Sequence, residues 1–179
     1  MEEAFLEKDV IETTRRYLQA NGYIIIYGER GGPDLVAYNN VKNELLVIEV
    51  RGVPTRHKIK GRDKGESKKG STIRSQFRNW PDKIIAELMD REYEWIHRTK
   101  PWVAEVIEKI EKIGTRKPPA VRYVGVLGYH EKYLEVLEKK KHALSKLGYE
   151  FWLIDKESNI RYSYPPWYSH KSNLLHWVV

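Results

Sequence analysis

The chain has 179 residues, enough for one well-cored domain, and its composition gives no sign of two independent domains. It contains no cysteine, which excludes disulfides, thiolate catalysis and cysteine-ligated zinc. No apolar run reaches membrane-spanning length and no basic start precedes an apolar signal core, so we expect a cytoplasmic protein without a membrane partner. The formal charge of +7 at pH 7 indicates a polyanionic partner.

In chain order, the first predicted element is an amphipathic helix over residues 3–20, with Val10 and Leu18 on its apolar face. Glu7 falls near the middle of that apolar arc. A carboxylate on a buried face is costly unless it is paired or lies near a cation. The alternative is that Glu7 marks the edge of the core near the helix start, where acids suit the helix dipole.

A hairpin follows this helix. Residues 23–27 predict a buried strand, and residues 35–38 and 45–50 predict two antiparallel strands joined by a turn rich in Asn and Lys. Folding the hairpin about its midpoint places Asp34 opposite Glu49. Directly opposed Cβ atoms lie about 4.5 to 5.5 Å apart, so two carboxylates there repel each other.

Something positive must therefore lie between Asp34 and Glu49. A divalent cation with oxygen ligands is the usual solution. The two-residue period of a strand also puts Arg51 on the same face as Glu49. The alternative is that the two acids simply occupy exposed strand ends.

A basic loop leaves the second hairpin strand. Between residues 56 and 74 the sequence has eight cationic side chains against two acids. The eight are Arg56, Lys58, Lys60, Arg62, Lys64, Lys68, Lys69 and Arg74. We expect this loop to clamp a phosphate backbone, although most charge runs are solvated surface.

The second half of the chain predicts a helical insertion over about residues 73–114. Its first helix is capped by Ser71 or Thr72 and must kink or restart at Pro81, and its second is capped by Thr99 and ends at Gly114. The later predicted elements are a strand at 121–127, a helix at 132–147, strands at 150–154 and 160–164, and an aromatic tail at 165–179.

This element order predicts an α/β fold, a mixed sheet covered by helices, in a single domain with its core at about 1–55 and 119–164. The cluster Lys139-Lys140-Lys141 lies on a predicted helix and is interpreted as its solvated face. The aromatic residues Trp95, Trp102, Tyr149 and Trp152 are interpreted as core.

The first half of the chain resembles the PD-(D/E)xK nuclease superfamily, which has the restriction-endonuclease-like fold. Archaeal Holliday-junction resolvases and RecB-type nuclease domains are the nearest members in character. The resemblance rests on the inward Glu7, on Pro33-Asp34 opening the hairpin, on Glu49-Val50-Arg51 closing it, and on Gln76 in the following helix. The strand, helix, strand ending is compatible with the same fold.

The resemblance implies that Asp34 and Glu49 bind Mg²⁺ or Mn²⁺ and that the carbonyl of Val50 completes the set. Glu7 would bind the metal or orient one of its ligands. Gln76 would match the glutamine of the RecB-type downstream motif, although Trp80 stands where a tyrosine is expected. These assignments are catalytic roles carried over from the family.

Arg51 is the main departure, because the family has a lysine that orients the attacking water and stabilises the phosphorane. Arginine keeps the positive charge but is always protonated, so it can act electrostatically and not as a base. Lys58 or Lys60 could supply the missing ammonium group.

The expected function is a metal-dependent DNA phosphodiester hydrolase, an endonuclease on structured or damaged DNA. A further possibility is that the basic loop contacts a partner protein or RNA. The alternative is a nuclease-fold module that binds nucleic acid without cutting it. By analogy with resolvases, in which two equivalent strands need two active sites, the resemblance implies a homodimer.

Overall fold

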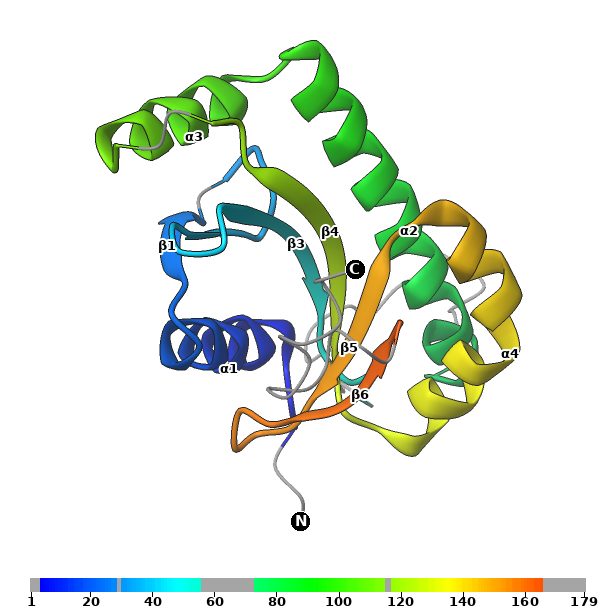
Figure 1. Cartoon of the computed structure of the whole chain (residues 1–179). Coiled ribbons are helices and arrows are strands. Elements are labelled where there is room, and N and C mark those ends of the chain that lie inside the picture. Colours follow the sequence, from blue (N-terminus) through cyan, green and yellow to red (C-terminus); the bar gives the residue numbers. More distant parts are fainter. Residues whose placement is uncertain (1–3, 29, 56–72, 115–116, 166–179) are drawn as a thin grey trace, which may run out of the picture.

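A computed structural model describes residues 4–28, 30–55, 73–114 and 117–165 (Figure 1). Within these ranges the chain forms a six-stranded sheet whose spatial order equals its chain order. The strands are β1 (Ile24–Tyr27), β2 (Leu35–Asn39), β3 (Glu44–Arg51), β4 (Ala120–Gly128), β5 (Glu150–Ile154) and β6 (Ile160–Tyr164). β1, β2 and β3 are antiparallel, β3, β4 and β5 are parallel, and β6 is antiparallel to β5. The mixed α/β sheet predicted from the sequence is confirmed.

Helices flank both faces of this sheet (Figure 1). They are α1 (Glu7–Ala20), α2 (Ile73–His97), α3 (Pro101–Lys112) and α4 (Glu131–Leu147). α1 covers one face, whereas α2, α3 and α4 pack on the other. Among the described residues, no helix combines the length and apolar character needed to cross a bilayer.

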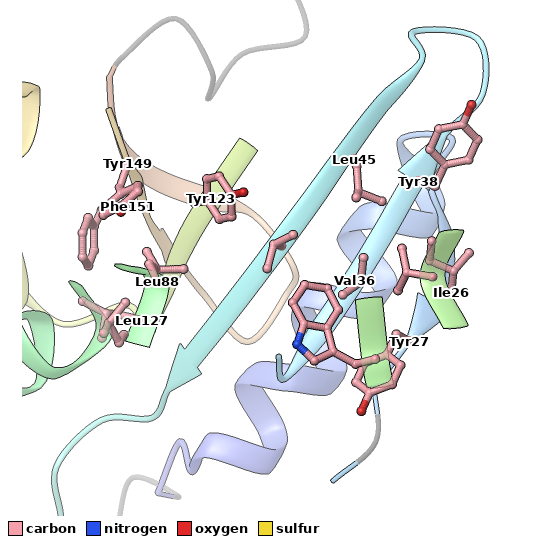
Figure 2. Packing of buried hydrophobic residues seen from close by; sticks show 14 of the residues in the cluster. Ile26, Tyr27, Val36, Tyr38, Leu45, Leu88, Tyr123, Leu127, Tyr149 and Phe151 are labelled. Atoms are coloured by element: carbon pink, nitrogen blue, oxygen red, sulfur yellow. The ribbon is translucent and has the colours of Figure 1, made fainter. Parts of the chain in front are cut away.

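The core consists of two apolar layers separated by the sheet. Because strand side chains alternate, Leu35 and Ala37 of β2 face α1, while Val36 and Tyr38 face α2 and α3. Figure 2 shows members of the second layer, among them Val36, Leu45 and Leu127. Trp102, Tyr149 and Trp152 are buried, as predicted.

The predicted strands and the last helix agree with the observed ones to within one residue at each end, but the first helix begins later than expected. It starts at Glu7 and not at residue 3. The preceding chain is extended because the carbonyl of Phe5 accepts a hydrogen bond from the N–H of Val53 at 2.8 Å. The carboxylate of Asp9 then accepts the N–H of Leu6 at 3.0 Å, which satisfies a donor at the helix start.

Two further helix predictions need correction. Of the kink or restart expected at Pro81, the restart does not occur, because α2 runs through this residue as one helix with the proline ring buried. The residue that caps α3 is Lys100 and not Thr99, so that Pro101 takes the first helical position, where its missing N–H costs nothing. The proposed caps Ser71 and Thr72 lie outside the described residues.

Candidate functional site

The end of strand β3 carries the predicted acids. The hairpin register pairs Leu35 with Ile48, and this brings the next residues, Asp34 and Glu49, side by side on the face covered by α2. Asp34 Oδ2 also accepts the N–H of Val50 at 2.7 Å. The juxtaposition expected from the hairpin is therefore present.

Glu7 reaches the same place from the first turn of α1. Gly52, directly after β3, makes this possible, because a Cβ atom there would lie 2.5 Å from the backbone nitrogen of Glu7. Only a glycine lets the two backbones approach so closely. As a result, Glu7 Oε2 lies 3.7 Å from Arg51 Nη1.

The guanidinium of Arg51 occupies the middle of this group. Its Nη1 donates to the carbonyl of Val50 at 2.6 Å and lies 3.9 Å from Asp34 Oδ2. Its Nη2 pairs with Glu87, which projects from α2. The Val50 carbonyl, expected as a metal ligand, is thus held by arginine in this structure.

Glu49 is held by a chain of contacts that leads away from the strand. Glu49 is only 3% exposed, and its carboxylate accepts a hydrogen bond from Arg91 Nε at 2.6 Å. Arg91 Nη1 in turn donates to Glu94 at 2.9 Å, and the indole N–H of Trp102 donates to the same Glu94 oxygen at 2.7 Å. Helices α2 and α3 therefore orient the acid on β3.

The sequence analysis missed Glu87, Arg91 and Glu94. Their spacing of four and three residues puts them on one face of a helix, next to the buried Ile84 and Leu88. Charged residues on an otherwise apolar helix face were the available signal. It was the same kind of signal that singled out Glu7.

The electrostatics of the acids reflect their crowding. Burial, and after it the charge of Asp34, raises the pKa of Glu49 to about 8, while Arg91 acts in the opposite direction. Burial also raises the pKa of Glu7, which Arg51 opposes and the charges of Asp34 and Glu87 reinforce. Both acids lie in surroundings that disfavour their negative charge.

Among the described residues, the site holds more acid than its arginines balance. Arg51 and Arg91 face five carboxylates, those of Glu7, Asp34, Glu49, Glu87 and Glu94. In addition, the Oε2 atom of Glu87 is buried and has no hydrogen-bond partner in the described part of the chain. A buried acceptor without a donor is costly and calls for a cation or another donor.

These oxygen donors suit a hard divalent cation. Within the described ranges, however, no three His, Asp or Glu side chains are arranged around a common metal position. Arg51 lies among the oxygens instead. The surplus charge and the orphaned oxygen of Glu87 fit a cation whose entry requires the guanidinium to leave the Val50 carbonyl.

The remaining predicted residues are only partly described. Gln76 lies in the first turn of α2, eleven residues before Glu87, which is about 16 Å along the helix axis. Its catalytic role stays a prediction. Arg74 is exposed on α2, whereas the other seven predicted phosphate contacts, Arg56, Lys58, Lys60, Arg62, Lys64, Lys68 and Lys69, lie outside the described residues.

The position of the site in the sheet also bears on function. Strands β3, β4 and β5 are parallel, and Arg51 ends β3 at their shared carboxyl edge. Ligands of α/β sheets bind preferentially at that edge.

Comparisons of the chain with protein-family models, with curated proteins and with solved structures each found no match.

Proposed function

We propose that the protein is an endonuclease that hydrolyses phosphodiester bonds of DNA with Mg²⁺ or Mn²⁺. One observation carries the proposal: among the described residues, five acidic side chains face two guanidiniums at the carboxyl edge of the parallel strands, and one buried carboxylate oxygen has no partner. Such crowding of acids, which raises the pKa of Glu49, suits a bound cation that would hold them ionised. The mixed sheet, with its acids on β2 and β3, supports the restriction-endonuclease-like assignment.

In this proposal Asp34, Glu49 and the carbonyl of Val50 hold the metal ion, and Glu7 binds it or orients a ligand. The bound ion would lower the pKa of a water molecule and neutralise charge on the phosphate. Arg91 keeps the carboxylate of Glu49 in place through its 2.6 Å contact. Glu94 restrains Arg91 in turn.

Arg51 supplies positive charge at the scissile phosphate. Once its guanidinium leaves the Val50 carbonyl, it can donate two parallel hydrogen bonds to phosphate oxygens. It cannot remove a proton, because arginine stays protonated. Arg51 therefore acts by electrostatic stabilisation, and another group must accept the proton of the attacking water.

The test is a cleavage assay on branched, flapped, single-stranded and duplex DNA with Mn²⁺ or Mg²⁺. Purified wild type is expected to cleave at least one substrate, and Asp34→Asn and Glu49→Gln are expected to lose at least about 100-fold in rate while still binding DNA. Glu12→Gln is the matched control, because Glu12 is an exposed acid on α1 outside the site. Robust cleavage by both site variants would contradict the proposal.

One contact favours a second function, that of a nuclease-fold module that binds nucleic acid without cutting. Arg51 Nη1 lies between the Val50 carbonyl, Glu7 and Asp34, where a cation would need the same oxygens. If the arginine keeps that position permanently, wild type will cleave none of the four substrates.

The homodimer stays a prediction, and sedimentation of the purified protein would test it.

A further inference from the structure

A second charged feature lies between α2 and α4. It is an open groove of about 570 Å³, here called the α2–α4 groove. Five cationic side chains and one acid line it. They are Arg74 and Arg78 from α2, and Lys132, Glu135, Lys139 and Lys140 from α4.

Aromatic packing forms the base of the groove. The buried ring of Phe77 contacts His130 and Tyr133, with ring centroids 4.6 and 4.8 Å apart. The hydroxyl of Tyr133 then donates to the carbonyl of Gly52 at 2.9 Å, directly after Arg51. The groove is therefore built on the same strand end as the acidic site.

Most of the cations in the groove are available to a ligand. Lys140 pairs with Asp82, and Lys132 Nζ lies 5.5 Å from the centre of the Phe77 ring. Within the described part of the chain, Arg74, Arg78 and Lys139 form no ion pair.

The arrangement of Arg74 and Arg78 carries a cost. They are four residues apart on one helix, and like charges at that spacing destabilise a helix by about 0.2 to 0.5 kcal/mol. Lys139 is exposed, as the sequence analysis expected of this helix face, and the structure adds that Lys139 and Lys140 line this groove. An unfavourable concentration of charge that the fold itself does not use indicates a ligand of opposite charge.

We propose that the α2–α4 groove binds the sugar–phosphate backbone of a nucleic acid. Arg74 and Arg78 lie about 6 Å apart along their helix, and Lys132 and Lys139 about 10 Å apart along theirs. Two facing rows of cations suit a linear polyanion better than a single phosphate group. Contacts of this kind bind without reading sequence.

A nucleic acid fits better than an acidic peptide because the charge continues along the chain. Residues 56–72, which directly precede α2, add seven Lys and Arg against two acids. In sequence, the basic residues thus continue from this segment into α2, and nucleic acid carries one negative charge on every nucleotide over a long stretch.

The groove also lies at a defined distance from the acidic site. Arg78 and Arg74 precede Glu87 by nine and thirteen residues, about 13 and 20 Å of helix. At 3.4 Å per nucleotide along one strand this equals roughly four to six nucleotides. The inference rests on the proposed function in taking nucleic acid as the substrate, and it makes the groove a separate anchoring contact.

The test measures binding of a fluorescein-labelled DNA duplex by anisotropy in EDTA, where no cleavage occurs. The groove variant is Arg74→Gln, Arg78→Gln and Lys139→Gln together, all three side chains being exposed. The matched control replaces three exposed lysines outside the groove lining, Lys83, Lys100 and Lys146, by glutamine. Thermal unfolding checks that both triple variants remain folded.

We expect the groove variant to bind DNA at least about 10-fold more weakly. The plot of log binding constant against log salt concentration should become shallower by about 2 to 3, because up to three phosphate contacts are lost. The control is expected to change affinity less than about threefold. Equal weakening by both variants, or by neither, overturns the inference. So does a labelled poly-glutamate peptide that binds more tightly than DNA and depends on the groove residues.

The two proposals fail in different ways. If Asp34→Asn and Glu49→Gln abolish cleavage but the groove variant binds like the control, the groove inference fails and the nuclease proposal stands. If cleavage is absent or does not depend on those acids while the groove variant loses binding, the nuclease proposal fails and the groove stands.

Discussion

The protein contains two clusters of arginine and glutamate, on opposite faces of one sheet. On the α1 face, Arg122 of β4 binds both oxygens of Glu150 on β5 at 2.5 and 2.7 Å and donates to Glu44 of β3 at 2.7 Å. The hydroxyl of Tyr23 also contacts Glu44. This cluster lies at the amino ends of the parallel strands, whereas the acidic site lies at their carboxyl ends.

The two clusters differ in how well they are satisfied. Arg122 faces two carboxylates, and both oxygens of Glu150 have hydrogen-bond partners. In the acidic site, as far as the structure describes it, two guanidiniums face five carboxylates and Glu87 Oε2 has no partner. A closed cluster stabilises the fold by its own contacts, whereas an open one retains charge for a ligand.

Replacing Arg122 by methionine would break the closed cluster and should have the largest effect on stability. Glu150 would be left buried without its cation, which typically costs about 3 to 5 kcal/mol. Urea denaturation measures the loss. Arg15→Met is the control. Arg15 pairs with the exposed Glu12 at 3.7 Å, so this replacement should cost less than about 1 kcal/mol. Similar losses in both variants would remove the distinction between the clusters.

Replacing Arg51 by methionine should weaken nucleic-acid binding far less than it slows cleavage, by about 100- to 1000-fold, because a donor to the reacting phosphate is lost. Single-turnover cleavage with enzyme in excess separates this chemical effect from binding. Arg51→Lys keeps the charge and should retain more activity than Arg51→Met. An unchanged rate in Arg51→Met would show that the guanidinium serves only the resting structure.

Manganese should stabilise the open cluster and not the closed one. At a concentration 100 times its Kd, a ligand that binds only the folded state stabilises it by about 2.7 kcal/mol. We therefore expect Mn²⁺ to raise the unfolding temperature of wild type and of Glu12→Gln, but not of Glu49→Gln. An equal shift in all three proteins would place the metal elsewhere.

The smallest expected change in stability distinguishes the two clusters most clearly, because its sign should differ between them. Glu87→Gln keeps an oxygen that can accept from Arg51, puts an amide donor in place of the unpartnered Oε2 and removes a charge from the surplus, so it should stabilise the metal-free protein by about 0.5 to 1 kcal/mol. Glu150→Gln removes half of a satisfied ion pair and should destabilise it by about 1 to 3 kcal/mol. Chemical denaturation in EDTA compares the two directly. Opposite signs support the division between open and closed clusters, and equal signs contradict it.

Sequence patterns predicted the parts of the site that depend on local geometry. Asp34 and Glu49 meet because the turn and the two-residue strand period define the hairpin register. Glu7 was identified because helical periodicity put a carboxylate among apolar residues. In both cases one short segment holds all the information needed.

Other features required the packed chain. Arg91 meets Glu49 across 42 residues of sequence, and Trp102 reaches Glu94 from another helix. The late start of α1 likewise depends on a distant partner, since Phe5 bonds to Val53 after β3. No local period encodes such contacts.

By itself, the sequence determined the order and bounds of the strands and the pairing of Asp34 with Glu49, because backbone hydrogen bonding and side-chain alternation are local properties. Only the tertiary structure decided that Arg51, expected on the face of Glu49, would bind the Val50 carbonyl, that α2 would add Glu87 and Arg91, and that Lys139 and Arg74 would line one groove. Those outcomes depend on how helices pack against the sheet, and that packing is the joint result of many distant contacts.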